Sequence, residues 1–190
     1  TGAELAYLAS STNSGNSYSG KYFMLMNNID LCGIEWTPIG VGSNYDVFST
    51  AFRGNFDGQF HTISGLYITK TTSKNVGLFG TVCNATIQNL QVGDAYVAVE
   101  QNGNNGSTSA GILIGSLDGS NMVSHISVSG EVSVRTLHSG ICSVAAVIGY
   151  THYNTNITVN NVSAIAMVSG YCSGYNSYVG GIIGVKNNSS

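Results

Sequence analysis

Gly77-Leu78-Phe79-Gly80 is the first of four similar apolar tetrapeptides that recur along the chain and end in glycine. The other three are Ile112-Leu113-Ile114-Gly115, Ala146-Val147-Ile148-Gly149 and Gly181-Ile182-Ile183-Gly184. Their final glycines are 35, 34 and 35 residues apart. A constant period of this length is the signature of a repeat protein, and we interpret each tetrapeptide as a short buried strand.

Two more elements keep the same period and lie between the tetrapeptides. One comprises residues 87–92, 123–128 and 159–164, and the other residues 96–99, 131–134 and 166–169. Both alternate apolar residues with polar or small ones, which is typical of a strand buried on one face. Each repeat is therefore predicted to contribute three short strands.

A single repeat of this size is too small to bury its own apolar face. Stacking equivalent strands about 4.8 Å apart would satisfy their backbone hydrogen bonds and create one continuous core. We therefore predict an all-β fold, a right-handed parallel β-solenoid (β-helix) of three-strand coils of about 35 residues. Helical repeats are disfavoured by the abundance of Gly, Val, Ser and Thr. A β-sandwich or barrel would explain the short strands but not the long fixed period.

The N-terminus differs from the repeats. Thr1 and Glu4 have the spacing of a capping box, which predicts a short helix to about Ser10 that caps the first coil. We assign residues 1–20 to this helical cap and a loop, and residues 21–190 to the solenoid. Strands are expected within 22–26, 28–31, 36–40 and 52–66. The last repeat lacks its second and third strands, so we expect the array to continue beyond this chain or to be covered there.

Composition narrows the function classes. Only 8% of residues are charged and the net charge is −3, so no basic patch for nucleic acid is expected. No apolar run approaches the roughly 20 residues of a membrane helix, so we predict no membrane insertion by this segment. The four cysteines contain no C-x-x-C pair, and the four histidines lack metal-binding spacing, so no metal or other cofactor is predicted.

The tetrapeptide Gly77-Leu78-Phe79-Gly80 resembles the GLUG motif, a Gly-Leu-hydrophobic-Gly signature. The upstream segments Asn28–Leu31, Trp36–Gly40 and Phe52–Leu66 resemble those that precede the motif in such proteins. The resemblance is strong over roughly residues 1–92 and weakens in the later copies. The family occurs in large bacterial surface proteins, including adhesins, and in regions flanking IgA-specific proteases. It implies an extracellular or cell-surface location, neighbouring repeats or domains in a longer chain, and a mostly non-catalytic role.

We therefore expect a non-catalytic segment of a secreted or cell-surface adhesin-like protein, serving as a stalk, binding a host glycan or surface protein, or both. The alternative is a carbohydrate-active β-helix enzyme, a polysaccharide lyase or hydrolase, or its accessory module. For that alternative, Asp94 and Glu131 fall near the same phase of adjacent coils and are the candidate carboxylate pair. Asp57 and Asp46 could contribute to a calcium site, although Asp57-Gly58 is more typical of a tight turn.

Tyrosines concentrate in the C-terminal third and are the candidate ligand-binding residues, because aromatic rings in loops provide contact area for sugars or proteins at low entropic cost. They are Tyr150, Tyr153, Tyr171, Tyr175 and Tyr178. Structural ladders of stacked tyrosines are an equal alternative. Cys142 and Cys172 share a local Ser-Gly-x-Cys-Ser frame, which favours a disulfide between neighbouring coils.

Overall fold

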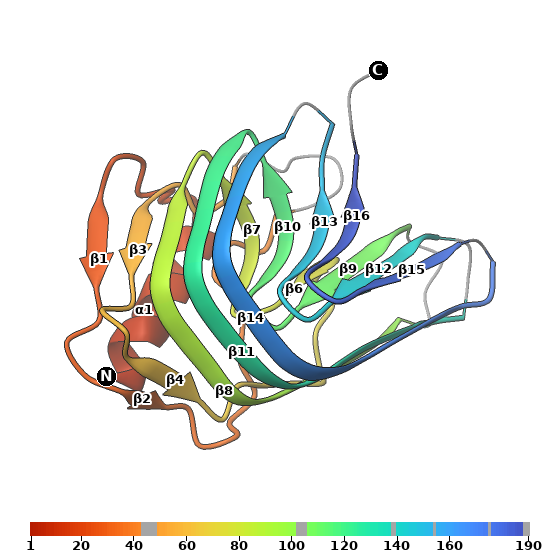
Figure 1. Ribbon diagram of the computed structural model, residues 1–190, viewed down its shortest axis with the longest axis horizontal. Coiled ribbons are helices and arrows are strands. Elements are labelled where there is room, and N and C mark those ends of the chain that lie inside the picture. The colour runs from red at the N-terminus through yellow and green to blue at the C-terminus, as the bar shows by residue number, and fades with distance from the viewer. Residues whose placement is uncertain (43–48, 102–105, 138–139, 154, 175, 188–190) are drawn as a thin grey trace.

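The protein is a parallel β-solenoid of about four turns with one helix at its N-terminal end (Figure 1). The computed structural model describes residues 1–42, 49–101, 106–137, 140–153, 155–174 and 176–187. Every strand pairing among these residues is parallel, as stacking of equivalent repeat positions requires. The pairings are β1–β3, β2–β4, β3–β8, β4–β8, β5–β8, β6–β9, β7–β10, β8–β11, β9–β12, β10–β13, β11–β14, β12–β15 and β13–β16.

The helix α1 spans Gly2–Asn13, slightly longer than predicted, and begins with the expected capping box. The Glu4 backbone N–H donates to the Thr1 hydroxyl at 3.3 Å, and the Glu4 carboxylate accepts from the Thr1 nitrogen at 2.7 Å. At the other end, the Asn13 side chain accepts from the backbone N–H groups of Gly40 and Val41. These contacts fix the helix to the first turn, against which it buries Leu5, Leu8, Ala9 and Thr12.

The strands form three sheets. Sheet A contains β1 (Tyr22–Met24), β2 (Ile29–Asp30), β3 (Asn55–Asp57), β4 (Thr62–Ser64), β5 (Tyr67–Ile68), β8 (Thr86–Gln101), β11 (Ser120–Thr136) and β14 (Asn156–Cys172). Sheet B contains β7 (Phe79–Cys83), β10 (Ile114–Asp118), β13 (Ile148–Thr151) and β16 (Ile183–Lys186). Sheet C contains β6 (Asn75–Val76), β9 (Thr108–Gly111), β12 (Cys142–Ala145) and β15 (Ser177–Gly180). Residues 36–40, predicted as a strand, contribute only an isolated bridge from Ile39 to Phe79.

The glycine-terminated tetrapeptides are corners, which corrects the prediction that each is a strand. Their first two residues form the bend between a sheet C strand and a sheet B strand, and their last two begin the sheet B strand. At the final glycine the sheet B backbone passes very close to sheet C. A Cβ added to Gly115 would lie 2.3 Å from the Val76 nitrogen and 2.6 Å from the Asn75 carbonyl carbon. The corner therefore requires a residue without a side chain.

The second and third predicted strands of each repeat are in fact one continuous strand, bent in its middle, as β8, β11 and β14 show (Figure 1). Asn89, His125 and Asn161 lie in register along these strands, and each has a positive φ of 50° to 54°. Asn and His tolerate this left-handed conformation better than most residues. The pairing continues on both sides of this irregular residue, so each long strand remains a single element of sheet A.

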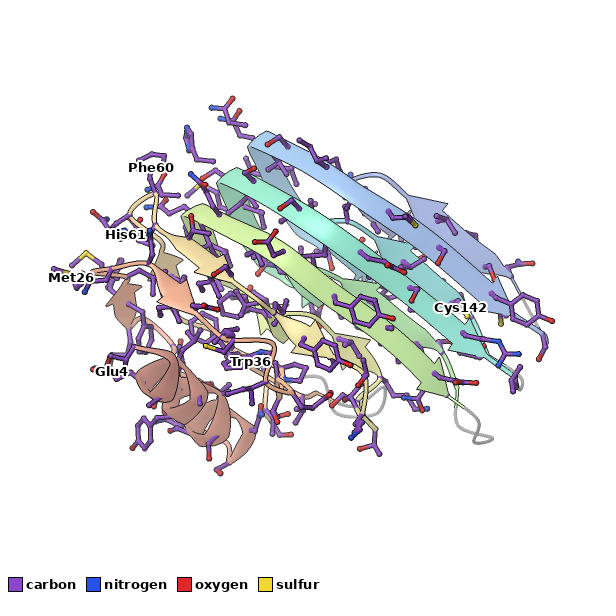
Figure 2. All side chains as sticks on the ribbon, turned by 90° about the horizontal axis from the view of Figure 1, so that it is seen from below. Glu4, Met26, Trp36, Phe60, His61 and Cys142 are labelled. Atoms are coloured by element: carbon purple, nitrogen blue, oxygen red, sulfur yellow. The ribbon has the colours of Figure 1, made fainter. Side chains whose placement is uncertain are left out.

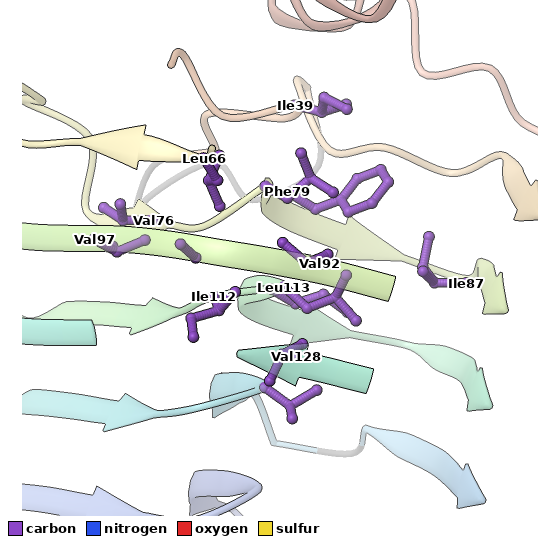
Figure 3. Packing of buried hydrophobic residues seen from close by; sticks show 14 of the residues in the cluster. Ile39, Leu66, Val76, Phe79, Ile87, Val92, Val97, Ile112, Leu113 and Val128 are labelled. Atoms are coloured by element: carbon purple, nitrogen blue, oxygen red, sulfur yellow. The ribbon is translucent and has the colours of Figure 1, made fainter. Parts of the chain in front are cut away.

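The core is a set of columns in which apolar residues stack from turn to turn. Ile87, Val123 and Val159 form one such column in sheet A, and Val92 and Val128 belong to another. Figure 3 shows Ile87, Val92 and Val128 among the buried residues, which also include Phe79 of β7 and Leu113 of a corner. In β14 the corresponding apolar residues are only half-buried, because β11 covers one side of that strand and no strand of the described part of the chain pairs with the other.

Candidate functional site

The outward-facing residues of sheet A line a groove at the N-terminal turns. Its first part, of about 300 Å³, is bordered by Tyr22, Phe23, Met24, Asn55, Phe56, Asp57, Thr86, Gln88 and Met122. Its second part, of about 250 Å³, is bordered by Asn55, Asn84, Ala85, Thr86, Ser120, Asn121, Met122, Asn156 and Thr158. The two parts share Asn55, Thr86 and Met122, so they adjoin, and we call them together the sheet A groove.

Register explains how residues distant in sequence meet in this groove. Asn55 pairs with Thr86, Thr86 with Met122, and Met122 with Thr158, so these four side chains form one column across four strands. Alternate residues of each strand point to the same side, so the neighbours in the sequence, such as Ile87, face the core instead. The groove therefore runs across the strands, along the direction in which the turns stack.

Asp57 is held rigidly at one side of the sheet A groove. Its carboxylate accepts hydrogen bonds from the Gln88 side chain at 2.9 Å, the Asn89 side chain at 3.0 Å and the Gln59 backbone N–H at 2.8 Å. Burial would raise the pKa of Asp57, but these hydrogen bonds outweigh it and lower the pKa below its ordinary value. Asp57 therefore stays ionised at neutral pH and orients the Gln88 amide.

Asparagines fix the other part of the groove by joining neighbouring turns. The Asn84 side-chain oxygen accepts from the Ser120 N–H at 2.8 Å, and the Asn121 oxygen accepts from the Ala85 N–H at 3.1 Å. The Asn121 amide also donates to the Asp118 carbonyl at 2.7 Å. These side-chain hydrogen bonds take the place of backbone hydrogen bonds at the corner between sheets B and A. They fix the positions of the amide groups in the absence of a ligand.

The groove combines these fixed polar groups with exposed apolar side chains. Tyr22 is 82% exposed, and Met24 and Met122 are also accessible. A few placed amides and hydroxyls beside flat apolar surface are what a site needs to recognise a ligand that carries both hydroxyl groups and C–H faces. The volumes of the two parts lie near the lower end of the usual range for ligand pockets, about 300 to 1,000 Å³.

A larger hollow of about 480 Å³ lies between α1 and the first strands of sheet A. Its border is mainly apolar and includes Leu5, Leu8 and Met26. Two of its few polar residues, Thr1 and Glu4, already bond to each other. Because it has fewer polar groups available to orient a ligand, the sheet A groove is the stronger candidate.

The tyrosines predicted to bind a ligand come from different parts of the solenoid. Tyr150 lies in sheet B, where its hydroxyl meets the Asn187 amide, and Tyr153 follows it, 66% exposed. Tyr171 lies near the end of β14, beneath the Arg135 guanidinium, and Tyr178 lies in sheet C. Tyr175 is outside the described residues. Tyr150 and Tyr153 therefore lie near the start of β14, whereas Tyr171 and Tyr178 lie near its end. The four described tyrosines do not share one groove.

The two carboxylates considered as a pair, Asp94 and Glu131, are not register partners. Glu131 is in register with Tyr96, and Asp94 belongs to the irregular segment where the pairing shifts between Val128 and Gly130. The bulge moves Asp94 out of the phase that the repeat period predicts, because it adds one residue to β8. Within the described part of the chain, no group of three His, Cys, Asp or Glu residues is placed to hold a metal. Asp46, considered for calcium, lies outside the described residues.

The structure brings Cys142 and Cys172 together, but for a different reason from the one predicted. Cys142 is in register with Thr108 and Ser177, so Cys172 is not its equivalent on the next turn. Instead, Cys142 begins β12 and Cys172 ends β14, and both sulfurs contact the Thr136 hydroxyl, at 3.2 and 3.3 Å. The disulfide itself stays a prediction.

Sequence reasoning did not identify the sheet A groove. Its residues come from β1, β3, β8, β11 and β14, so only the register places them together. The available signal was the polar or long side chain at the outward positions of aligned repeats, such as Thr86, Met122 and Thr158. That signal locates the outer face but does not say which part of it is hollow.

Comparison with known proteins gives two similar sequences and no match to any family model or solved structure. A Gly-rich membrane protein of Evansella cellulosilytica is 31% identical over 118 residues, covering 57% of this chain. Halomucin of Haloquadratum walsbyi is 30% identical over 188 residues, covering 87% of this chain. The chain spans 12% and 2% of the lengths of these relatives. No helix among the described residues is long and apolar enough to cross a membrane.

Proposed function

We propose that this chain is a non-catalytic segment of a secreted or cell-surface adhesin-like protein, in which the solenoid forms a stalk and the sheet A groove binds a host glycan. The observation that carries the binding function is the groove itself, with its fixed amides beside exposed Tyr22 and methionines. The surface location is supported by the two relatives, named a Gly-rich membrane protein and halomucin.

The stalk function follows from the way the solenoid grows. Each turn adds a strand to all three sheets, so it lengthens the molecule by about 4.8 Å at constant cross-section. Stacked core columns such as Ile87, Val123 and Val159 keep successive turns aligned. Such a rod holds a binding surface away from its attachment point without requiring any particular ligand.

The glycan class follows from the chemistry of the groove. Sugars present hydroxyl groups, which pair with amides such as Gln88 and Asn55, and C–H faces, which pack on aromatic rings such as Tyr22. The groove runs across the strands, so an extended chain can follow the stacking direction of the turns. Asp57 accepts three protein hydrogen bonds, which supports a positioning role rather than that of a catalytic acid.

The test is a glycan array screen of the purified chain, followed by titration calorimetry with the strongest glycan. Tyr22→Ala should weaken binding at least tenfold, since it removes the exposed ring, whereas Tyr153→Ala should leave it unchanged. Tyr153 is a matched control because it is also well exposed but lies outside the groove.

Three outcomes would contradict the proposal. Loss of binding in Tyr153→Ala but not in Tyr22→Ala would move the site to the C-terminal tyrosines. Binding to host proteins stripped of their glycans would replace a glycan with a protein partner. Release of shortened or unsaturated sugars by the isolated chain would favour the alternative of a carbohydrate-active enzyme.

A further inference from the structure

Cys142 and Cys172 stand at the two ends of a single solenoid turn. Cys142 is the first residue of β12 in sheet C, the chain then passes through β13 in sheet B, and Cys172 is the last residue of β14 in sheet A. The two ends of this turn meet where sheet A and sheet C adjoin, and Figure 2 shows Cys142 there, near the ends of the long strands. A bond between them would close one complete turn.

The side-chain contacts place the two sulfurs next to each other. The Thr136 hydroxyl lies 3.2 Å from the Cys142 sulfur and 3.3 Å from the Cys172 sulfur. The Cys142 thiol also donates to the carbonyl of Tyr171, which directly precedes Cys172, at 3.3 Å. The Cys172 thiol donates to the carbonyl of Gly140, two residues before Cys142. These reciprocal contacts require the two cysteines to lie side by side.

The preceding turn shows what these positions hold when no thiol is present. Cys142 is in register with Thr108, and Cys172 is in register with Thr136. Thr108 and Thr136 begin β9 and end β11, so they occupy the same two ends of the preceding turn. The fold therefore accepts threonine at both positions, and the cysteines are a departure from the repeat in one turn.

The other two cysteines lie elsewhere. Cys32 is exposed and follows β2, and Cys83 is buried at the end of β7 in sheet B. Burial raises the pKa of the Cys142 thiol, and its hydrogen bond with the Cys172 thiol raises it further. Cys142 is therefore poorly reactive toward reagents in solution, whereas half-buried Cys172 is the more accessible partner.

We infer that Cys142 and Cys172 form a disulfide that closes the turn β12–β13–β14 into a covalent ring. The oxidant is a low-molecular-weight disulfide such as oxidised glutathione. The Cys172 thiolate attacks it and releases one glutathione thiolate, and the Cys142 thiol then loses its proton and displaces the second. The protein loses two protons and two electrons. Oxidised glutathione takes up these protons and electrons and becomes two molecules of glutathione thiol.

The ring supports a strand whose burial is incomplete among the described residues. Among the described residues β14 pairs with β11 on one side only, and its apolar residues are only half-buried. Local opening of β14 requires the strand to leave β11, which a covalent closure at Cys172 opposes. The disulfide therefore reinforces a strand that is only partly packed.

The test oxidises the purified chain in a glutathione redox buffer and maps its peptides without reduction. The expected result is one cross-linked pair, Cys142 with Cys172, and an intact mass lower by two hydrogen atoms. Hydrogen exchange across residues 156–172 should slow by up to about a hundredfold relative to the reduced chain, because the closed loop restricts the opened state.

The matched variant is Cys142→Thr with Cys172→Thr, which copies the preceding turn and should fold. Its hydrogen exchange should be the same with and without reductant, while Cys32→Ser should behave like the unchanged chain. Three results would overturn the inference: alkylation of both thiols after oxidation, cross-links to Cys32 or Cys83, or unchanged exchange in β14 when the bond forms.

Discussion

Replacing Gly115 by alanine tests whether the repeated glycines are required by close backbone approach at the corners. A Cβ at this position would lie 2.3 Å from the Val76 nitrogen, 2.6 Å from the Asn75 carbonyl carbon and 2.8 Å from the Gly80 oxygen. All three are backbone atoms of paired strands, so none can rotate away. The methyl group fits only if sheets B and C separate at this turn.

The expected cost follows from that clash. Overpacking a well-packed site costs about 1–3 kcal/mol and occasionally more, and a clash with backbone atoms belongs at the upper end. For a chain of this size, each kcal/mol lowers the melting temperature by roughly 2–4 °C. Gly115→Ala should therefore melt roughly 5–12 °C below the unchanged chain in a far-ultraviolet circular dichroism scan.

Gly181→Ala is the matched control, because it lies at the corner of the last turn and a Cβ there would meet nothing within 4 Å. Replacing such a glycine restricts the unfolded chain, so the melting temperature should stay the same or rise slightly. The reasoning is refuted if Gly115→Ala melts within 2 °C of the unchanged chain, or if both variants lose stability equally.

Three further outcomes are expected. Phe79→Ala should lower the free energy of unfolding, measured in urea, by about 3–5 kcal/mol, because Phe79 is fully buried. Phe60 is 64% exposed, so Phe60→Ala should change this free energy by less than about 0.5 kcal/mol. Burial lowers the pKa of His152 below 6.5, nearby Asp118 opposes this, and the buried Nε2 has no hydrogen-bond partner. The folded state therefore favours neutral His152, so the urea midpoint should decrease as pH falls from about 7 to 5, and less so in His152→Gln. Reducing the proposed disulfide, which closes a loop of about 30 residues, should cost between about 3 and 4 kcal/mol of unfolding free energy, measured with and without reductant; an equal midpoint would contradict a closed ring.

The parallel solenoid could be predicted because its core repeats in the sequence. The column Ile87, Val123 and Val159 is apolar in every turn, and stacking is the arrangement that buries such residues at a constant period. The capping box at Thr1 and Glu4 was also visible, because it depends on residues only three positions apart. Both signals are local or periodic, so neither needs knowledge of tertiary contacts.

The corners could not be recognised in the same way. Leu78 and Leu113 lie in bends, yet both are fully buried, so the bends are as apolar as strands. A short apolar run does not by itself distinguish the two conformations. The distinguishing fact is the approach of sheet C to the final glycine, such as Gly115, and that approach is a contact between segments remote in sequence.

The long bent strand was divided in two for a related reason. Gly93 and Asp94 lie between the two predicted segments, 87–92 and 96–99, and shift the alternation of buried and exposed residues by one position. In sequence this shift resembles an interruption, because glycine and aspartate are common in turns. In the structure, Asp94 has a positive φ of 52°, and the pairing of β8 with β11 continues on both sides of a register shift between Val128 and Gly130.

The closeness of Cys142 and Cys172 was predicted from a false equivalence. Their similar sequence frames suggested neighbouring positions on adjacent turns, whereas the register partners of Cys142 are Thr108 and Ser177. The two cysteines meet because a turn returns almost to its starting point. Sequence comparison reveals repeated positions, but it does not reveal which non-equivalent positions the closure of a turn brings together.

The inner and outer columns of sheet A differ in a way that bears on the kind of ligand it can bind. The inner positions are apolar in every turn, whereas one outer column holds Tyr67 and Tyr96, whose rings stack, and then changes to Glu131 and Met167. A face that binds a regular lattice would need the same group at each step of about 4.8 Å. The changing outer residues instead favour one localised site, and Tyr22 and Asp57 place the fixed polar groups and the exposed ring of that site at the N-terminal turns.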